Sequence, residues 1–192
     1  MSSQDPAPQD PTTQDPTTQD PTTNAEMQLA GYFARYEPEI GQLGIALRAR
    51  LRDRLPGLFE IVYMYESQGS LVISYSPTEN GYEGLCGIAL YPEGPKLFFG
   101  QGARLSKSDP SKLLKGRGKT VRHVLLNSVE DFERAEIEVL IAAAVELANL
   151  QLDASAEGAV ILRAEAQRKR AGRSMKAETP TSTRRAKRPG AE

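Results

Sequence analysis

The sequence has a single cysteine, a single histidine and no tryptophan. One cysteine, Cys86, permits no internal disulfide, and one cysteine with one histidine is a poor basis for a zinc or other transition-metal site. The acidic residues show no spacing typical of an EF-hand. We therefore predict no cofactor and no metal-ligating residues.

Long apolar runs and a leader-like start are also missing. The longest apolar stretch, residues 139–150, is too short to span a bilayer and contains Glu146. The opening MSSQDPAPQD has neither the basic segment nor the apolar stretch of a secretory signal. These features predict a cytoplasmic protein that has no membrane partner.

The formal net charge of −1 conceals two ends of opposite sign. Residues 4–23 repeat QDPTT, once as QDPAP, and their only charged residues are aspartates. Proline in every unit and the lack of large apolar side chains predict a disordered acidic tail over residues 1–23. Residues 163–192 carry ten Lys and Arg against three Glu. We predict a basic, largely disordered tail over 156–192, with room for the preceding helix to extend into its start.

Residues 24–155 carry the patterns of a folded domain. They predict a helix over Ala25–Tyr36 capped by Asn24, and a second helix that begins at Pro38 and ends at Pro56-Gly57. A period of two then predicts strands at 58–65, 70–76, 85–91, 96–99 and 120–126, followed by a helix that starts at Ser128. Short connections favour antiparallel neighbours. The order predicts an α+β two-layer sandwich, with N-terminal helices and a C-terminal helix on a roughly five-stranded, mostly antiparallel sheet.

The segment 100–120 is long for a simple connection between two strands. It contains six Lys and Arg residues and several glycines, against the single acidic residue Asp109. Backbone amides near glycines and cationic side chains together can form an anion cradle, although such segments are also found as solvated turns. It is not a Walker loop, because Leu113 stands where that motif needs glycine. The candidate site within 100–123 comprises Arg104, Lys115, Gly116, Arg117, Gly118, Lys119, Arg122 and His123.

Two residues of the strands have both a structural and a chemical interpretation. His123 alternates with Val121 and Leu125, which fits a partly buried histidine better than a general base without an evident nucleophile. Cys86 lies in an apolar strand, which fits core packing better than a reactive thiol. No catalytic residue emerges, so the sequence favours a binding protein over an enzyme and leaves catalysis open.

Several motifs in order resemble those of the bacterial YdhG-like domain family, long classed as a domain of unknown function. The likeness covers about residues 27–150. It lies in Ser76-Pro77-Thr78-Glu79, Ala89-Leu90-Tyr91-Pro92, Leu97-Phe98-Phe99, Gln101-Gly102-Ala103, Leu113-Leu114-Lys115-Gly116 and Gly118 through His123. The resemblance implies a compact domain with helices packed on an antiparallel sheet. Some relatives are described as frataxin-like iron chaperones, and the family supplies no established catalytic residues.

The sequence therefore predicts a non-enzymatic binding module with segment 100–123 as an anion or partner site. The partner would be a phosphorylated small molecule, a polyanion or a protein. One alternative is frataxin-like iron binding, which would need an exposed acidic surface, whereas the acidic residues of the N-terminal helices give way to arginines. Another is non-specific nucleic-acid binding through the basic C-terminal tail, which has no aromatic side chain to stack on bases.

Overall fold

The computed structural model describes residues 21–81, 84–156 and 158–163. The disorder predicted for residues 1–20 and 164–192 falls outside these residues. Where the acidic repeat meets the domain, the prediction is corrected: helix α1 (Pro21–Phe33) begins inside the last QDPTT unit. Proline suits the first turn of a helix, since its missing N–H would have no partner there. Asn24 is therefore inside α1 rather than its cap, and its Oδ1 accepts a hydrogen bond from Gln28 Nε2 at 2.8 Å.

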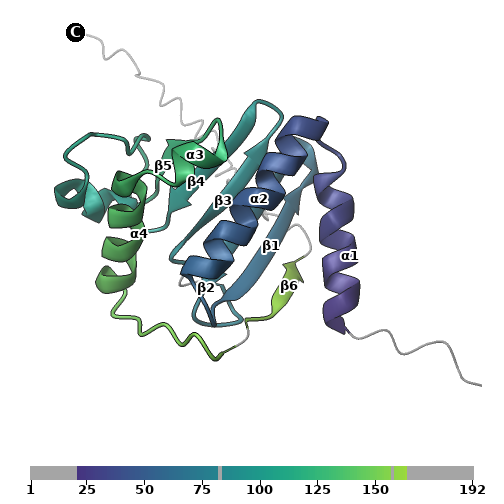
Figure 1. The fold of residues 1–192 in the computed structure, drawn as a ribbon. Helices are drawn as coiled ribbons and strands as arrows, with labels where there is room; N and C mark the ends of the chain where they lie inside the picture. The colour runs from purple at the N-terminus through teal and green to yellow at the C-terminus, as the bar shows by residue number, and fades with distance from the viewer. Residues whose placement is uncertain (1–20, 82–83, 157, 164–192) are drawn as a thin grey trace, which may run out of the picture.

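The sheet has six strands in the order β5-β4-β3-β2-β1-β6 (Figure 1). The strands are β1 (Phe59–Tyr65), β2 (Ser70–Ser76), β3 (Cys86–Tyr91), β4 (Gly94–Phe99), β5 (Arg122–Leu125) and β6 (Val160–Arg163). All neighbours from β1 to β5 pair antiparallel, as their short connections predict. Strand β6 pairs parallel with β1 and comes from the segment assigned above to the basic tail, so the predicted five strands are corrected to six.

Helices cover one face of this sheet and complete the predicted α+β two-layer sandwich. Helix α2 (Pro38–Arg54) runs across the front of the sheet in Figure 1, and α1 lies beside it. A Cβ on Gly44 of α2 would lie 2.5 Å from Leu90 Cδ2, so glycine permits close contact with β3. Ser128 caps a short helix, α3 (Val129–Phe132), by accepting from Asp131 N at 3.2 Å. This helix ends at Phe132, and α4 (Ala135–Leu147) follows as a separate helix.

The core lies between the helices and one face of the sheet. Alternate residues of the central strands point into it, among them Ile73, Ile88 and Leu97, which are fully buried. They pack with Leu47 and Leu51 of α2 in one hydrophobic cluster that also includes residues of α3 and α4. The opposite face of the sheet carries no described helix (Figure 1).

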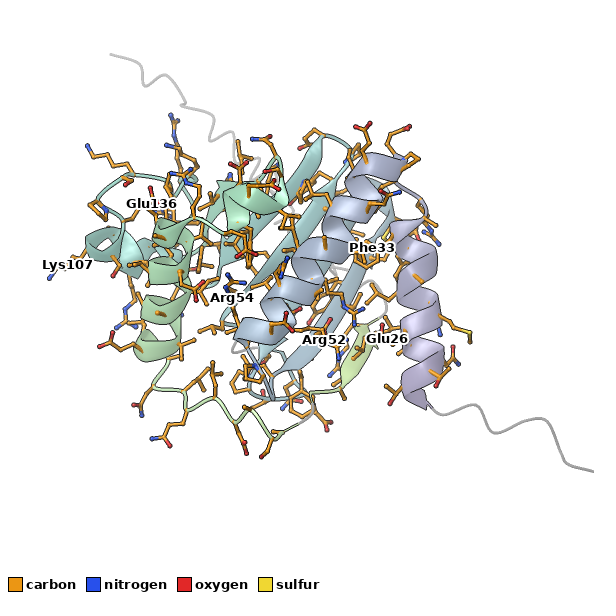
Figure 2. All side chains as sticks on the ribbon, in the orientation of Figure 1. Glu26, Phe33, Arg52, Arg54, Lys107 and Glu136 are labelled. Carbon is orange, nitrogen blue, oxygen red and sulfur yellow. The ribbon has the colours of Figure 1, made fainter. Side chains whose placement is uncertain are left out.

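A cluster of charged residues around the buried Glu60 connects α1 and α2 to the sheet. Glu60 of β1 is 2% exposed and accepts from Arg48 Nε at 2.5 Å, and Arg52 Nε lies 3.0 Å from its other oxygen. Arg48 also donates to both oxygens of Glu26 in α1, at 2.7 and 2.8 Å. Figure 2 shows Glu26 and Arg52 facing each other between the two helices and the sheet. Tyr75 completes the cluster by donating its hydroxyl to the carbonyl of Arg48 at 3.2 Å.

Candidate anion-binding site

The segment between β4 and β5 folds around its only carboxylate. A 3-10 helix, η2 (Gly102–Ser108), leads into Asp109, which is 8% exposed. The two oxygens of Asp109 accept from the backbone amides of Leu113 and Leu114 at 2.8 and 2.9 Å. The carboxylate is thus used to hold the chain in place, and it pairs with none of the neighbouring cationic side chains of the described chain.

A hairpin-like closure shapes the second half of the segment. Lys115 and His123 exchange both of their backbone hydrogen bonds, at 2.7 and 2.9 Å. Gly116 follows with φ of +112°, a conformation that side chains disfavour. Arg122 Nη1 donates to the carbonyls of Gly118 and Val121 at 2.6 and 2.8 Å. These bonds hold the loop in place, so Arg122 has a structural role in addition to any contact with a ligand.

Three of the predicted cations are exposed and have no side-chain partner within the described chain: Arg104, Arg117 and Lys119. Lys115 donates to the carbonyl of Lys112 at 2.8 Å and has no carboxylate partner there. Elsewhere the pattern is different, because glutamates contact Arg35, Arg48, Arg50, Arg52, Arg54 and Arg134. Lys107 extends outward from η2 in the same uncompensated region (Figure 2). We call residues 104–122 the cationic segment.

A pocket of about 660 Å³ opens beside the cationic segment at one end of the strands. Arg104 and Thr120 line it together with Ser74 and Phe98 of the sheet and Leu147 of α4. Its wall is built by close backbone approach, since a Cβ on Gly100 would clash with the carbonyl oxygen of Gly84. The pocket thus combines apolar and polar side chains with one unpaired guanidinium, an arrangement suited to a small ligand that carries an anionic group.

The other predicted site residues do not converge on this pocket. Arg122 lines a second depression of about 540 Å³ between η2 and the loop, which also contains Lys112 and Asp109. Gly116, Arg117, Gly118 and Lys119 line neither of these two pockets. His123 lies across from Phe98 in the pairing of β5 with β4, on the face of the sheet opposite the main core. Burial and, second, the nearby Lys96 lower the pKa of His123, which keeps its imidazole neutral at pH 7.

Within the described chain, the remaining chemistry-bearing residues show no second site. Cys86 is fully buried, and this burial raises the pKa of its thiol to about 12, as suits a core residue. No group of three or more His, Cys, Asp or Glu side chains could hold a metal ion in residues 21–81, 84–156 and 158–163. None of the described helices combines the length and apolar character needed to cross a bilayer.

Sequence reasoning found Arg104 but missed the residues that surround it. Ser74, Phe98 and Leu147 belong to strands and a helix far apart in the chain, and nothing in their local sequence marks them as pocket residues. The excess of cations over one aspartate can be counted in the sequence. The hydrogen bonds that Asp109 accepts from two backbone amides cannot be predicted from it. Comparison with protein-family models, curated proteins and solved structures finds no match to this chain.

Proposed function

We propose that this chain is a non-enzymatic binding protein that holds an anionic ligand at the cationic segment, with Arg104 as the anchor in the pocket. One observation carries the proposal: positive charge is balanced by glutamates over α2 but is left unbalanced from Arg104 to Lys119. An unpaired guanidinium presents a fork of N–H donors that matches a phosphate or carboxylate. We propose a phosphorylated small molecule as the ligand class, since the pocket has the volume for one.

We also propose that the chain is a cytoplasmic member of the YdhG-like family, on the motifs given above. Residues of those motifs line the pocket, among them Phe98, Gln101, Thr120 and Val121. No observation on the described residues favours the iron role of some relatives over anion binding. An iron site would need several clustered carboxylates, and the acidic residues near Arg48 are engaged in ion pairs.

Thermal unfolding of the full-length protein with inorganic pyrophosphate and with ADP tests the anion site. A ligand at a hundred times its Kd adds about 2.7 kcal/mol, which corresponds to a rise in Tm of several degrees for a domain of this size. We expect Arg104→Ala to abolish this rise and the double variant Arg117→Ala/Lys119→Ala to reduce it.

Arg50→Ala is the matched control, because it removes one exposed arginine whose partner is Glu133 and lies outside the cationic segment. It should keep the full rise in Tm. An unchanged Tm of the wild-type protein with both ligands over the millimolar range would refute the phosphate site. A rise that survives in all variants would show that the ligand binds elsewhere.

A further inference from the structure

The depression beside Arg122 is separate from the pocket that contains Arg104, and the two share no lining residue. Neighbouring residues line one or the other: Arg104 and Thr120 line the pocket, whereas Ala103 and Arg122 line the depression. The amide of Ala103 donates to the carbonyl of Thr120 at 2.8 Å. A Cβ on Gly102 would lie 2.6 Å from the Cβ of Arg122. The close contact of η2 with the start of β5 therefore forms a wall between the two cavities.

The guanidinium of Arg122 is held by the loop and still has free donors. Its Nη1 donates to the carbonyls of Gly118 and Val121. Among the described residues, neither its Nε nor its Nη2 has a hydrogen-bond partner, and no carboxylate pairs with it. These two nitrogens form an edge of the guanidinium that can bind two oxygens of one anion. Because Nη1 is already bonded, this edge is oriented before a ligand binds.

Lys112, which also lines the depression, has a backbone conformation that lysine rarely adopts. Its φ of +54° lies in the left-handed region, which favours glycine and, less strongly, asparagine. Its amide donates to the carbonyl of Asp109 at 3.1 Å, and its own carbonyl accepts from Lys115 Nζ at 2.8 Å. The side chain is exposed and pairs with no carboxylate of the described chain. Strained residues are concentrated at binding sites, which favours a contact between Lys112 and a ligand.

The only acidic residue that lines the depression is Asp109, and its carboxylate is engaged. Both of its oxygens accept from backbone amides of the loop. Two cationic side chains therefore face one carboxylate that already has hydrogen-bond partners. Ser106 adds an exposed hydroxyl that can donate a further hydrogen bond. The remaining lining residues are uncharged: Gly102, Ala103, Pro110 and Leu114.

We infer that the depression lined by Ser106, Lys112 and Arg122 is a second anion site, which binds phosphate or the phosphoryl group of a larger molecule. Arg122 binds two oxygens through Nε and Nη2, Lys112 neutralises the remaining charge, and Ser106 donates a hydrogen bond. Donors from η2, the loop and β5 suit a tetrahedral anion better than a planar carboxylate. The site goes beyond the proposed function, because it requires neither the pocket nor Arg104.

Amide chemical shifts of the isotopically labelled full-length protein, followed during titration with inorganic phosphate at constant ionic strength, test the inference. We expect saturable shifts at Ser106, Lys112 and Arg122. The Kd should be on the order of millimolar, because Ser106 and Lys112 are exposed to water. Acetate should give no saturable shift at these amides. Glycerol phosphate that shifts the same amides would identify the phosphoryl group of a larger molecule as the ligand, whereas a response to inorganic phosphate alone would identify the free ion.

Lys112→Asn and Lys107→Asn are matched variants, since each removes one positive charge from the cationic segment. Asparagine tolerates the left-handed conformation, so we expect Lys112→Asn to keep a Tm at least as high as that of the wild type. Its Kd for phosphate should rise about fivefold or more. Lys107 extends outward from η2 and lines neither cavity, so Lys107→Asn should change the Kd by less than about twofold. Arg104→Ala should leave the shifts at Ser106, Lys112 and Arg122 unchanged.

The inference is overturned if phosphate produces no saturable shift at these amides over the millimolar range. It is also overturned if Lys112→Asn and Lys107→Asn weaken binding equally, which would show a diffuse attraction to the cationic segment. Loss of every phosphate-induced shift in Arg104→Ala would place the anion in the pocket, so the proposed function would stand and the second site would be wrong. Shifts that persist in Arg104→Ala and disappear in Lys112→Asn would support the second site whether or not Arg104 anchors a ligand in the pocket.

Discussion

At the scale of single residues, the pKa values of two carboxylates in the cluster around Arg48 shift in opposite directions. Hydrogen bonding from Arg48 lowers the pKa of Glu26, which is partly exposed. Burial raises the pKa of Glu60, although hydrogen bonds and charge from Arg48 and Arg52 oppose the shift. Glu26 therefore stabilises the fold above its unfolded-state pKa and stops doing so as pH falls through its folded-state pKa. The raised pKa of Glu60 has the reverse effect: stability decreases as pH rises through it.

Arg48→Met tests this arrangement because it leaves the buried Glu60 carboxylate with Arg52 as its remaining ion-pair partner. We expect a loss of about 3–5 kcal/mol in the free energy of unfolding at pH 7. Without Arg48, the pKa of Glu60 rises further and that of Glu26 is lowered less, so the loss relative to wild type shrinks as pH is lowered toward 5. Urea unfolding followed by circular dichroism at both pH values measures the loss, since the chain has no tryptophan for fluorescence.

Two matched variants check the cause of that loss. Glu60→Gln removes the buried charge and leaves Arg48 its contact with Glu26, so we expect a smaller cost of about 1–2 kcal/mol. Arg50→Met removes an exposed ion pair and should cost less than about 1 kcal/mol. A loss for Arg48→Met that does not change between pH 7 and pH 5 would contradict the role assigned to the Glu60 charge.

At the scale of elements, local sequence predicts the strands that pair with their neighbours in sequence, but it does not predict the edge strand β6. The period-two runs and turn residues place β1 to β4 within two residues of their observed bounds, since each strand pairs with its neighbour in sequence. Strand β6 has only four residues and follows a polar stretch. Its partner β1 lies about a hundred residues earlier in the chain, so no turn motif next to β6 indicates the pairing.

Gly158 shows what this distant pairing requires. A Cβ at Gly158 would clash with the carbonyl oxygen of Leu58, just before the amide of Glu60 bonds to the carbonyl of Ala159 at 2.9 Å. Gly158→Ala should push β6 away from β1 and cost about 1–3 kcal/mol in the free energy of unfolding. Urea unfolding of the full-length protein measures this cost.

Gly31→Ala is the matched control for that substitution. Gly31 lies in α1, where an added Cβ would meet no atom within 4 Å, and alanine should stabilise the helix by about 0.5–1 kcal/mol. The two changes add the same methyl group and are expected to have opposite signs. Equal effects would contradict the close approach of β6 to β1.

At the scale of the whole molecule, composition predicts the cationic segment, and only the fold shows the pocket beside it. Composition was enough to find the cationic segment, because six cations against one aspartate can be counted along the chain. The pocket beside it could not be found that way: Ser74, Phe98 and Leu147 come from three distant segments, and only the fold brings them together. The cationic segment and the pocket both adjoin a sheet whose central strands are buried and whose edge strands are short.

Hydrogen exchange should reveal that difference between centre and edge. Strands β2 and β3 are flanked on both sides and are almost wholly buried, so their amides should exchange only through global unfolding. Strands β5 and β6 each have four residues, lie at the two edges and include exposed residues, so they should open locally and exchange faster. Mass spectrometry of peptides from the full-length protein measures the order. Amides of β6 that exchange as slowly as those of β3 would contradict this expectation and would show that the edge strand unfolds only together with the core.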